Sequence, residues 1–492
     1  MQIRIDRDAD VPIYRQIVDQ VAEQIRTGAL PAASRLPPIR RVAVELGITR
    51  LTVHSAYSEL QAQGLVESHV GRGTFVASQK SRAIARLSES AHHPEWVADG
   101  FIANLLQAGG QEDIVSFAQA FPAPETIPVR DLRRAVQLAM RRPASFDYGP
   151  IQGHAELREH IAAVLLDRGV STAAQRILIT AGAQQAIDVI LRTCTEPGDA
   201  IAVEAPTYPG VLELADLRHL RVLGVPSDDG GIRVDALEAM CATHRPRLLY
   251  LVPTCGNPTG RTLVQDRRAS ILSLARTHDM LIIEDDIYGL LAFDPPAPPA
   301  LKSDDQDDVV LYLTSFSKML APALRTGALL APVSLLPRLA AAKGSTDLVC
   351  SSLLQLALNE YLRQGYLLPH LDMVRDVYRE RCAAMRTAIE RYLPSCTASE
   401  PEGGLSIWLR LPDGVNESDF AADALDVGVA VVPGQAFFPD VQHGSFIRLG
   451  FGMQSPERIE RGIPALGQVL QAHVRRGPPR PSLARGTASP LV

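Results

Sequence analysis

The sequence predicts an α/β protein in which a large domain surrounds a mostly parallel sheet, with a smaller C-terminal α+β domain and a separate helical domain at the N-terminus. Three observations support this prediction. At 492 residues the chain exceeds what one ordinary core supports. From residue 113 onward, apolar runs alternate with amphipathic helical patterns, an order typical of parallel sheets. Residues 1–78 instead show three short helical patterns and a hairpin.

Composition and charge are those of an ordinary globular protein, with one local exception. Hydrophobic residues make up 46% of the chain and charged residues 21%, and the net charge is −6 at pH 7. Residues 26–80, however, carry seven basic and three acidic side chains, a net charge of +4, which leaves −10 for the rest. A basic segment on an acidic protein indicates a local electrostatic footprint, as nucleic-acid binding requires.

The cysteines and the N-terminus exclude several classes of protein. The six cysteines are scattered and never spaced as CxxC, so we expect neither a disulfide framework nor a zinc site. His92 and His93 could bind a metal, but the pattern offers no third ligand, and we expect an exposed pair and no metal. The start MQIRIDRDAD is too charged for a signal peptide, and no 18-residue apolar run exists. We therefore expect a cytoplasmic protein without membrane contact.

Three helical patterns open the chain. Apolar residues recur at three- and four-residue steps over residues 14–25. A pair of prolines then starts a second helix, which Gly47 ends. Thr49 can cap a third helix over Arg50–Gln63, whose outward face is polar and partly basic. Two short helices joined by a tight turn predict a helix-turn-helix.

A hairpin pattern follows these helices, because the run LVESHVGRGTFVAS reads as two short strands around Gly71, Arg72 and Gly73. Helices followed by a β-wing indicate a winged helix-turn-helix. In such a domain the last helix enters the major groove and the wing lies near phosphate or the minor groove. A small helical domain with a solvated polar face is the alternative interpretation.

The runs PIYRQIVDQVAEQI, SRLPPIRRVAVELGITRLTVHSAYSELQAQGLVES and GRGTFVA resemble the DNA-binding domain of GntR-type bacterial regulators. The resemblance covers nearly all of residues 12–77 and implies that the partner is a double-stranded DNA operator. Leu51 departs from the pattern, since this family often has a small polar residue there. The residues that the resemblance places on DNA are Arg40, Thr49, Arg50 and Thr52, with Gly71 and Arg72 at the wing.

Composition predicts four parts along the chain. Residues 1–78 form the DNA-binding domain, and residues 79–112, which lack a core periodicity, form a linker that lets the two domains move. Residues 113–472 form the larger domain. Residues 473–492 are proline-rich and polar, and we expect them to be a disordered tail.

Seven apolar runs in the larger domain predict strands. Ligand sites in open α/β sheets lie at the carboxyl ends of the strands, so we expect the chemistry to gather there. The predicted strands are Arg176–Thr180, Ala200–Val203, Arg221–Val225, Leu248–Pro253, Met280–Glu284, Val309–Leu313 and Gly327–Ala331.

Three of these strands are followed by residues that could bind a flat anionic ligand. Ala183 and Gln184 open a helix directly after the first strand, where free N–H groups and the helix dipole suit phosphate. Tyr208, between two prolines, could stack on a ring, although core packing explains it equally well. Asn257 precedes a proline, which holds it extended with its amide free to form hydrogen bonds.

An amine and a carboxylate follow the next two strands. Lys318, in the run TSFSK, could attack an aldehyde if it is kept partly out of water, although taken alone it is compatible with a surface lysine. Asp285 could hold a ring nitrogen protonated, and Tyr288 could reach a phenolic oxygen. Together with Arg325, these residues supply the partners that pyridoxal phosphate requires.

The order and spacing of NPTG, DDIY and SFSK resemble the fold-type I pyridoxal-phosphate enzymes of the aspartate aminotransferase family. The resemblance implies that Lys318 binds the cofactor covalently and that Tyr148 reaches the phosphate of a second subunit in a homodimer. It also implies that Arg448 pairs with a substrate α-carboxylate, although alone Arg448 could be a surface arginine. The other implied contacts are Asp285 to the ring nitrogen, Asn257 and Tyr288 to the 3-oxygen, Tyr208 on the ring face, and Ala183, Gln184, Ser315, Ser317 and Arg325 to the phosphate.

A GntR-type domain in front of an aminotransferase-like domain is the layout of the MocR subfamily of bacterial regulators. The resemblance implies a pyridoxal-phosphate-dependent transcriptional regulator that binds DNA on the nucleoid and senses the cofactor or a small amino compound. An active aminotransferase that carries a DNA-binding domain is the alternative, because the ring-binding and carboxylate-binding residues are all present. A third possibility is a cofactor with a structural role only.

Overall fold

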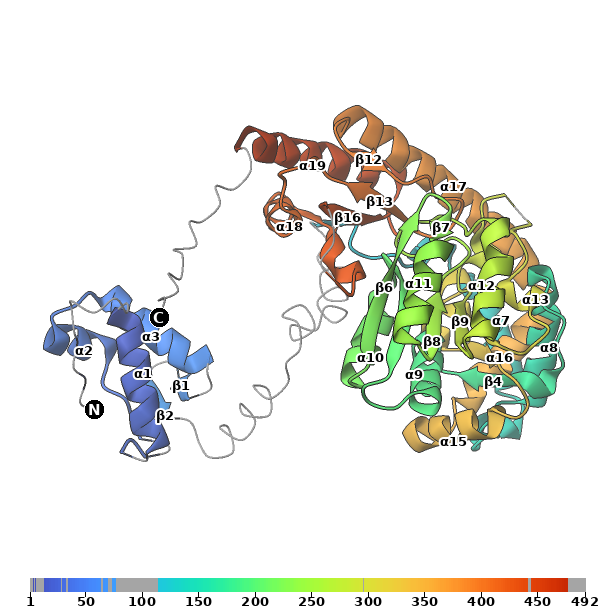
Figure 1. The fold of residues 1–492 in the computed structure, drawn as a ribbon, viewed down its shortest axis with the longest axis horizontal. Coiled ribbons are helices and arrows are strands. Elements are labelled where there is room, and N and C mark those ends of the chain that lie inside the picture. The colour runs from blue at the N-terminus through green and yellow to red at the C-terminus, as the bar shows by residue number, and fades with distance from the viewer. Residues whose placement is uncertain are drawn as a thin grey trace. The chain divides into compact units, whose positions relative to one another are not determined.

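The computed structural model describes residues 3, 5, 13–27, 29–31, 34–62, 65–69, 73–76, 114–294, 296–440 and 444–476. The chain divides into two compact units, one up to residue 95 and one from residue 96 onward, and Figure 1 labels their elements. Three predicted features lie outside the described residues. They are the linker at 79–112, the wing residues Gly71 and Arg72, and the part of the predicted tail beyond residue 476.

The first unit contains the three predicted helices and the predicted hairpin. Its core is a small cluster of buried apolar side chains that includes Val21, Val53 and Leu60. Gly47 forms the turn between the second and third helices with φ of 61°, a left-handed conformation that glycine adopts without steric cost. The elements are α1 (Ile13–Arg26), α2 (Ile39–Leu46), α3 (Arg50–Ala62), β1 (Val66–His69) and β2 (Gly73–Val76).

An eight-stranded sheet forms the centre of the second unit. The prediction of a mostly parallel sheet is confirmed, because β10, β9, β8, β5 and β6 pair in parallel. The pairs β10–β11, β11–β4 and β6–β7 are antiparallel. In the order β4-β11-β10-β9-β8-β5-β6-β7, the strands are Ile177–Thr180, Gly327–Leu330, Val310–Ser315, Leu281–Asp285, Leu248–Leu251, Ala200–Ala205, Arg221–Asp228 and Gly231–Ile232.

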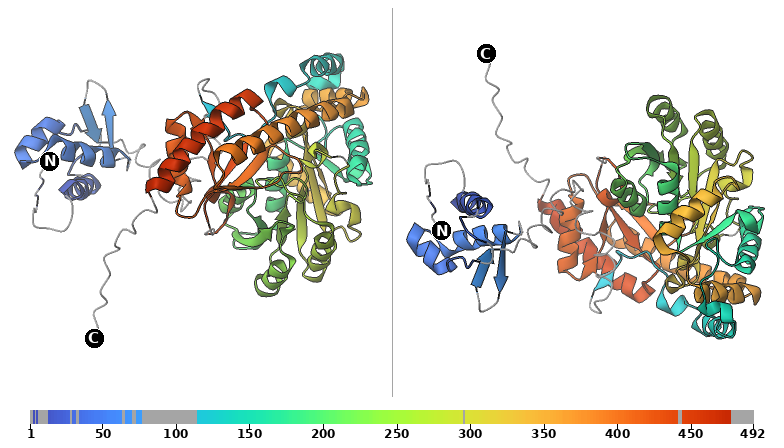
Figure 2. Two further views of the ribbon diagram at one scale, coloured as in Figure 1. Left: turned by 90° about the horizontal axis from the view of Figure 1, so that it is seen from above. Right: turned by 90° about the horizontal axis from the view of Figure 1, so that it is seen from below.

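Helices cover both faces of this sheet (Figure 2). Strands β8 and β10 in the interior of the sheet, and β4 at its edge, are buried along their whole length, which explains their uninterrupted apolar sequences. None of the described helices combines the length and apolar character that crossing a membrane requires. The helices are α7 (Val129–Ala139), α8 (Ala155–Leu165), α9 (Ala183–Cys194), α10 (Pro209–Leu217), α11 (Val234–His244), α12 (Gln265–Thr277), α13 (Leu301–Asp304), α14 (Phe316–Met319), α15 (Leu336–Asp347) and α16 (Ser352–Arg363).

A smaller α+β domain follows, as predicted. The long helix α17 (Leu367–Tyr392) packs against α19 (Pro456–Arg476), and the four-stranded antiparallel sheet lies in the same part of the unit (Figure 1). The first described strand of this unit, β3 (Val115–Ser116), pairs in parallel with β14 (Val429–Ala430) and so belongs with this domain. The other elements are β12 (Thr397–Ala398), β13 (Ser406–Arg410), α18 (Glu417–Asp426), β15 (Val432–Pro433) and β16 (Phe446–Gly450).

Candidate functional site

A cavity of about 530 Å³ opens at the carboxyl ends of the strands of the large sheet. This volume lies in the range of sites for small molecules. Every residue predicted to bind the cofactor or a carboxylate lines it, with the exception of Tyr148. The lining consists of Ala120, Phe121, Ala183, Gln184, Tyr208, Pro209, Asn257, Asp285, Ile287, Tyr288, Ser315, Ser317, Lys318, Pro322, Arg325 and Arg448.

The amine of Lys318 reaches the cavity from the short helix α14, directly after β10. Its Nζ atom donates a hydrogen bond to the backbone oxygen of Ala120 at 2.8 Å and lies 4.2 Å from the centre of the Phe121 ring. Burial lowers the pKa of Lys318 to about 7, and the positive charges of Arg448 and Arg325 act in the same direction. Near neutral pH a large fraction of this amine is therefore uncharged and nucleophilic.

The carboxylate of Asp285 lies at the end of β9 and lines the cavity. Its Oδ2 atom accepts a hydrogen bond from the hydroxyl of Tyr250 at 2.7 Å, whereas Oδ1 is buried and has no partner within hydrogen-bonding geometry among the described residues. Burial raises the pKa of Asp285 to about 7. A free buried oxygen beside a cavity is where a protonated ring nitrogen would bind.

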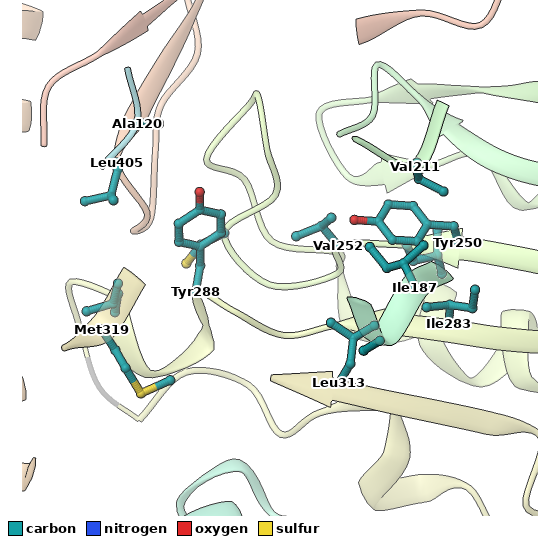
Figure 3. Packing of buried hydrophobic residues seen from close by; sticks show 14 of the residues in the cluster. Ala120, Ile187, Val211, Tyr250, Val252, Ile283, Tyr288, Leu313, Met319 and Leu405 are labelled. Atoms are coloured by element: carbon teal, nitrogen blue, oxygen red, sulfur yellow. The ribbon is translucent and has the colours of Figure 1, made fainter. Parts of the chain in front are cut away.

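Tyr250 is a residue of the site that sequence reasoning missed. It lies in β8, beside the strand that carries Asp285, and it is buried in the main hydrophobic cluster. Figure 3 shows it with Tyr288 among the other side chains of that cluster. Its position inside an apolar run made it indistinguishable from a core residue. The only signal was the need of Asp285 for a partner on a neighbouring strand.

The two acidic residues that flank Asp285 serve the fold. Both carboxylate oxygens of Glu284 accept hydrogen bonds from the first N–H groups of α13, at 2.7 and 2.8 Å. Asp286 forms a buried ion pair with Arg168 at 2.7 Å and accepts a hydrogen bond from the hydroxyl of Tyr312 at 2.8 Å. Because successive side chains of a strand point to opposite faces, only the middle carboxylate of the three faces the cavity.

A second end of the cavity gathers donors suited to phosphate. Gly182, with φ of 105°, precedes α9, so the free N–H groups at the start of that helix border the cavity. Arg325 donates from Nη2 to the oxygen of Ala181 at 2.7 Å and from Nη1 to the hydroxyl of Ser317 at 3.4 Å. A Cβ atom on Gly182 would lie only 3.1 Å from that Nη2 atom, so a larger residue would crowd the arginine.

Arg448 enters the cavity from β16 of the smaller domain. Its Nη2 atom donates to the oxygen of Ala118 at 2.6 Å and its Nη1 atom to Oδ1 of Asn257 at 3.4 Å, while its buried Nε atom has no partner among the described residues. The guanidinium lies over the Phe437 ring, with 5.1 Å between its carbon and the ring centre. Burial lowers the pKa of Arg448 to about 10. A bound carboxylate would pair with this buried charge and accept a hydrogen bond from the unpartnered Nε atom.

The three predicted tyrosines occupy different places. Tyr208 donates from its hydroxyl to Oε1 of Gln184 at 3.0 Å and lines the cavity. Tyr288 is buried at the cavity wall, and burial raises the pKa of its hydroxyl. Tyr148 is 80% exposed and does not line the cavity, so within one protomer it makes no part of this site.

The predicted DNA-contacting residues lie on exposed parts of the first unit where they are described. Thr49 caps α3, because its Oγ1 atom accepts a hydrogen bond from the N–H of Thr52 at 3.2 Å. The two threonine hydroxyls also lie 2.9 Å apart. Arg50, in the first turn of α3, and Arg40, on α2, are exposed. The start of α3 therefore presents a cation and capped N–H groups to solvent.

Comparisons with known proteins agree with both units. Residues 13–76 match the gntR family of bacterial regulatory proteins, and residues 113–466 match the class I and II aminotransferases. The probable rhizopine catabolism regulatory protein MocR of Rhizobium meliloti is 30% identical over 99% of this chain and 99% of its own. The uncharacterized HTH-type transcriptional regulator YisV of Bacillus subtilis is 32% identical over 94% of this chain and 97% of its own.

Solved structures agree with the fold of the larger unit. The crystal structure of the α-aminoadipate aminotransferase LysN from Thermus thermophilus, complexed with N-(5'-phosphopyridoxyl)-L-leucine, has a TM-score of 0.73. Its sequence is 32% identical to this one, and the match covers 81% of this chain and 100% of that chain.

Proposed function

This chain belongs to the MocR-type regulators, in which a GntR helix-turn-helix domain precedes a class I and II aminotransferase domain, and we propose that pyridoxal phosphate controls its binding to an operator. Family membership makes it a helix-turn-helix transcriptional regulator, and the helix-turn-helix implies DNA binding. The proposal adds the ligand and the way in which the ligand acts.

One observation carries the proposal. The amine of Lys318, whose pKa is lowered, lines the same cavity as the carboxylate of Asp285, which has one unpartnered oxygen. The hydrogen-bond donors around Arg325 that suit a phosphate line this cavity too. These are the groups that pyridoxal phosphate needs, because the bound cofactor supplies an aldehyde that can bond covalently to an amine. In this proposal Lys318 holds the aldehyde carbon and Asp285 the ring nitrogen. Asn257 and Tyr288 hold the 3-oxygen, and Tyr208 lies on the ring.

The phosphate is held by the start of α9, by the end of β10 with helix α14, and by Arg325. Gly182 brings the first N–H groups of that helix close to Arg325, so backbone dipole and guanidinium act on the same anion. The related Thermus enzyme, whose crystal structure contains a phosphopyridoxyl amino acid, supports this ligand class. In this proposal the residues that bind the phosphate are Ala183, Gln184, Ser315, Ser317 and Arg325.

The effector is the cofactor itself or a small amino compound with a carboxylate. Arg448 is the group that would bind that carboxylate, since it is buried and keeps a free Nε donor. It also belongs to the smaller domain, whereas Lys318 belongs to the larger one. A ligand that binds both would therefore favour one arrangement of the two domains, which is what a ligand needs in order to shift an equilibrium.

The regulator acts as a homodimer on double-stranded DNA. Tyr148 supports the dimer, because at 80% exposure it has no role in its own cavity and is free to reach the phosphate of a second subunit. Arg40, Thr49, Arg50 and Thr52 would contact the operator. Two copies of the helix-turn-helix would read two half-sites, as dimeric readers do.

The test is the affinity of the full-length protein for its operator, measured without ligand, with pyridoxal phosphate, and with the cofactor plus amino acids. We expect the cofactor or the amino compound to change the dissociation constant. An affinity that stays the same under all three conditions would refute the switch. A Lys318→Ala variant that keeps its ligand response would instead show that the cofactor has a structural role only.

An active aminotransferase is the second candidate. It is favoured by Asn257, which retains the NPTG form and bonds to Arg448, and by the complete set of cofactor partners. Incubation of the loaded protein with amino acids separates the two candidates. Formation of pyridoxamine phosphate and an oxo acid at a useful rate would establish the enzyme. A spectral change without turnover supports the sensor.

A further inference from the structure

We propose that Ile114–Phe121, hereafter the strap, transmits the ligand state of the cavity to the linker. This inference rests on the proposed function and specifies its regulation. The two basic side chains that would bind the cofactor and the effector both donate hydrogen bonds to backbone oxygens of the strap. Lys318 donates to Ala120 at 2.8 Å, and Arg448 donates to Ala118 at 2.6 Å.

The strap joins three parts of the molecule. Its first residue follows directly on the segment that connects the DNA-binding domain to the rest of the chain. Its middle is held by the smaller domain, and its end reaches Lys318 of the larger domain. The bonds to the smaller domain are Val115 N to Gly428 O (2.9 Å), Phe117 N to Ala430 O (2.8 Å), Gly450 N to Phe117 O (2.7 Å), Gln454 Nε2 to Ser116 O (2.9 Å) and Arg458 Nη2 to Ile114 O (2.7 Å).

Cofactor attachment competes with the strap for Lys318. The neutral amine and an aldehyde condense to a C=N bond, and the two hydrogens of the amine leave with the aldehyde oxygen as one water molecule. The N–H that Lys318 donates to Ala120 is one of those two hydrogens. Attachment therefore removes the bond that holds the end of the strap and also moves the amine from the face of the Phe121 ring.

Effector binding acts on the same segment through Arg448. A carboxylate bound by two parallel N–H groups would take Nε, which is free, together with a neighbouring Nη atom. One Nη atom is bonded to Ala118 of the strap and the other to Asn257. Each Nη atom carries two N–H groups, so the carboxylate shares the guanidinium charge with the oxygen of Ala118, weakens that bond, and acts on the strap in the same direction as cofactor attachment.

The coupling is reciprocal, as linkage requires. Because the bound strap occupies Lys318 and Arg448, it opposes ligand binding, and bound ligand opposes the strap contact. The strap is continuous in sequence with residues 79–113, which precede it and lead to the DNA-binding domain, so operator affinity is the readout for a change in its position. We expect a change in operator affinity of about tenfold, within the range of couplings between distinct sites.

The test uses the full-length protein, pyridoxal phosphate and a DNA duplex selected by this protein from a random library. Cofactor absorbance reports attachment, amide hydrogen exchange reports the strap, and fluorescence anisotropy reports DNA affinity. The test variant, Gln454→Met with Arg458→Gln, removes two donors that hold the strap and lie outside the cavity. The control, Arg461→Gln, removes the same charge from the same helix.

In the wild type and the control, attachment should raise amide exchange at residues 117–121 several-fold and change DNA affinity about tenfold. The test variant should bind the cofactor with unchanged absorbance but respond less than about threefold in DNA affinity. Cofactor attachment without a change in amide exchange at the strap would overturn the strap proposal but not the proposed function. A full change in DNA affinity in the test variant would have the same consequence. Failure of the wild type to attach the cofactor at all would overturn the proposed function and the strap with it.

Discussion

The hydroxyl of Tyr250 donates a hydrogen bond to Oδ2 of Asp285 at 2.7 Å, and this bond leaves Oδ1 as the oxygen without a hydrogen-bond partner among the described residues. The pair therefore fixes both the orientation of the carboxylate and the direction in which a ring nitrogen must approach. Tyr250 is 1% exposed, so its hydroxyl has no access to water as an alternative partner.

Tyr250→Phe should weaken cofactor binding by at least about tenfold, because a hydrogen bond to a buried charged group contributes about 1.5–3 kcal/mol. Loss of the bond also leaves Oδ2 without a partner and removes an interaction that lowers the pKa of Asp285. An absorbance titration with pyridoxal phosphate measures the affinity. Tyr312→Phe is the matched control, since that hydroxyl bonds to Asp286. Equal losses in the two variants would show that the effect is one of general packing.

The rate of cofactor attachment should rise with pH and level off above about pH 7. Burial lowers the pKa of Lys318 to about 7, so the nucleophilic neutral amine predominates above that pH and falls about tenfold for each unit below it. Stopped-flow absorbance at a series of pH values measures the rate. Asp285→Asn should move the profile to lower pH, because the Asp285 charge raises the pKa of Lys318. A rate that continues to rise to pH 10, as expected for a lysine side chain free in water, would contradict the prediction.

Asp285→Asn should stabilise the cofactor-free protein at pH 8 and have little effect at pH 4. The pKa of Asp285 is raised from 3.8 to about 7, so between these values the folded state holds a proton that the unfolded state has lost. Stability of the wild type therefore falls as pH rises through that interval, by up to about 4 kcal/mol. Thermal melting of the larger unit at both pH values measures the difference. A stability difference that does not vary with pH would contradict it.

Arg448→Gln should strongly weaken the response to amino acids while the cofactor still attaches. Loss of a bidentate arginine–carboxylate contact should weaken amino acid binding about 100-fold, or about 2.7 kcal/mol. Spectral titration of the loaded protein measures this loss. An amine without a carboxylate should bind both proteins equally. Arg410→Gln, on the neighbouring strand β13 and exposed, is the control.

Arg50→Gln and Arg40→Gln should each weaken operator binding and reduce the salt dependence of the affinity. Each lost phosphate contact lowers the slope of log affinity against log salt by about 1. Binding titrations from low to moderate salt measure the slope. Arg41→Gln removes the same charge from the neighbouring position on α2, where the arginine bonds to Glu45 at 2.7 Å. An equal change in this control would indicate that only the net charge of the domain matters.

Much of the cavity was predictable because its residues follow strands. Small and polar side chains directly after apolar runs are visible in the sequence, and parallel strands bring their carboxyl ends to one edge. This is why Asn257, Asp285 and Lys318 could be placed together without a structure. That reasoning did not place Arg448. Its role was predicted only from a family resemblance, since nothing in its local sequence indicates which domain it faces.

The remaining parts of the site could not be recognised from side-chain types in the sequence. The oxygens of Ala118 and Ala120 belong to the backbone, and alanine offers no hint that its carbonyl binds a cation. Tyr250 lies within an apolar run and resembles a core residue. The antiparallel edge formed by β11 and β4 was also not predictable, because alternation along a buried strand does not reveal its direction.

The three consecutive carboxylates at the end of β9 have an evolutionary consequence. Glu284 and Asp286 are tied into the fold by α13 and Arg168, while Asp285 alone serves the cavity. Selection on ligand chemistry and selection on folding therefore act on different residues of one short segment. Residues that line the cavity can therefore change without disturbing the hydrogen bonds that hold this end of the sheet.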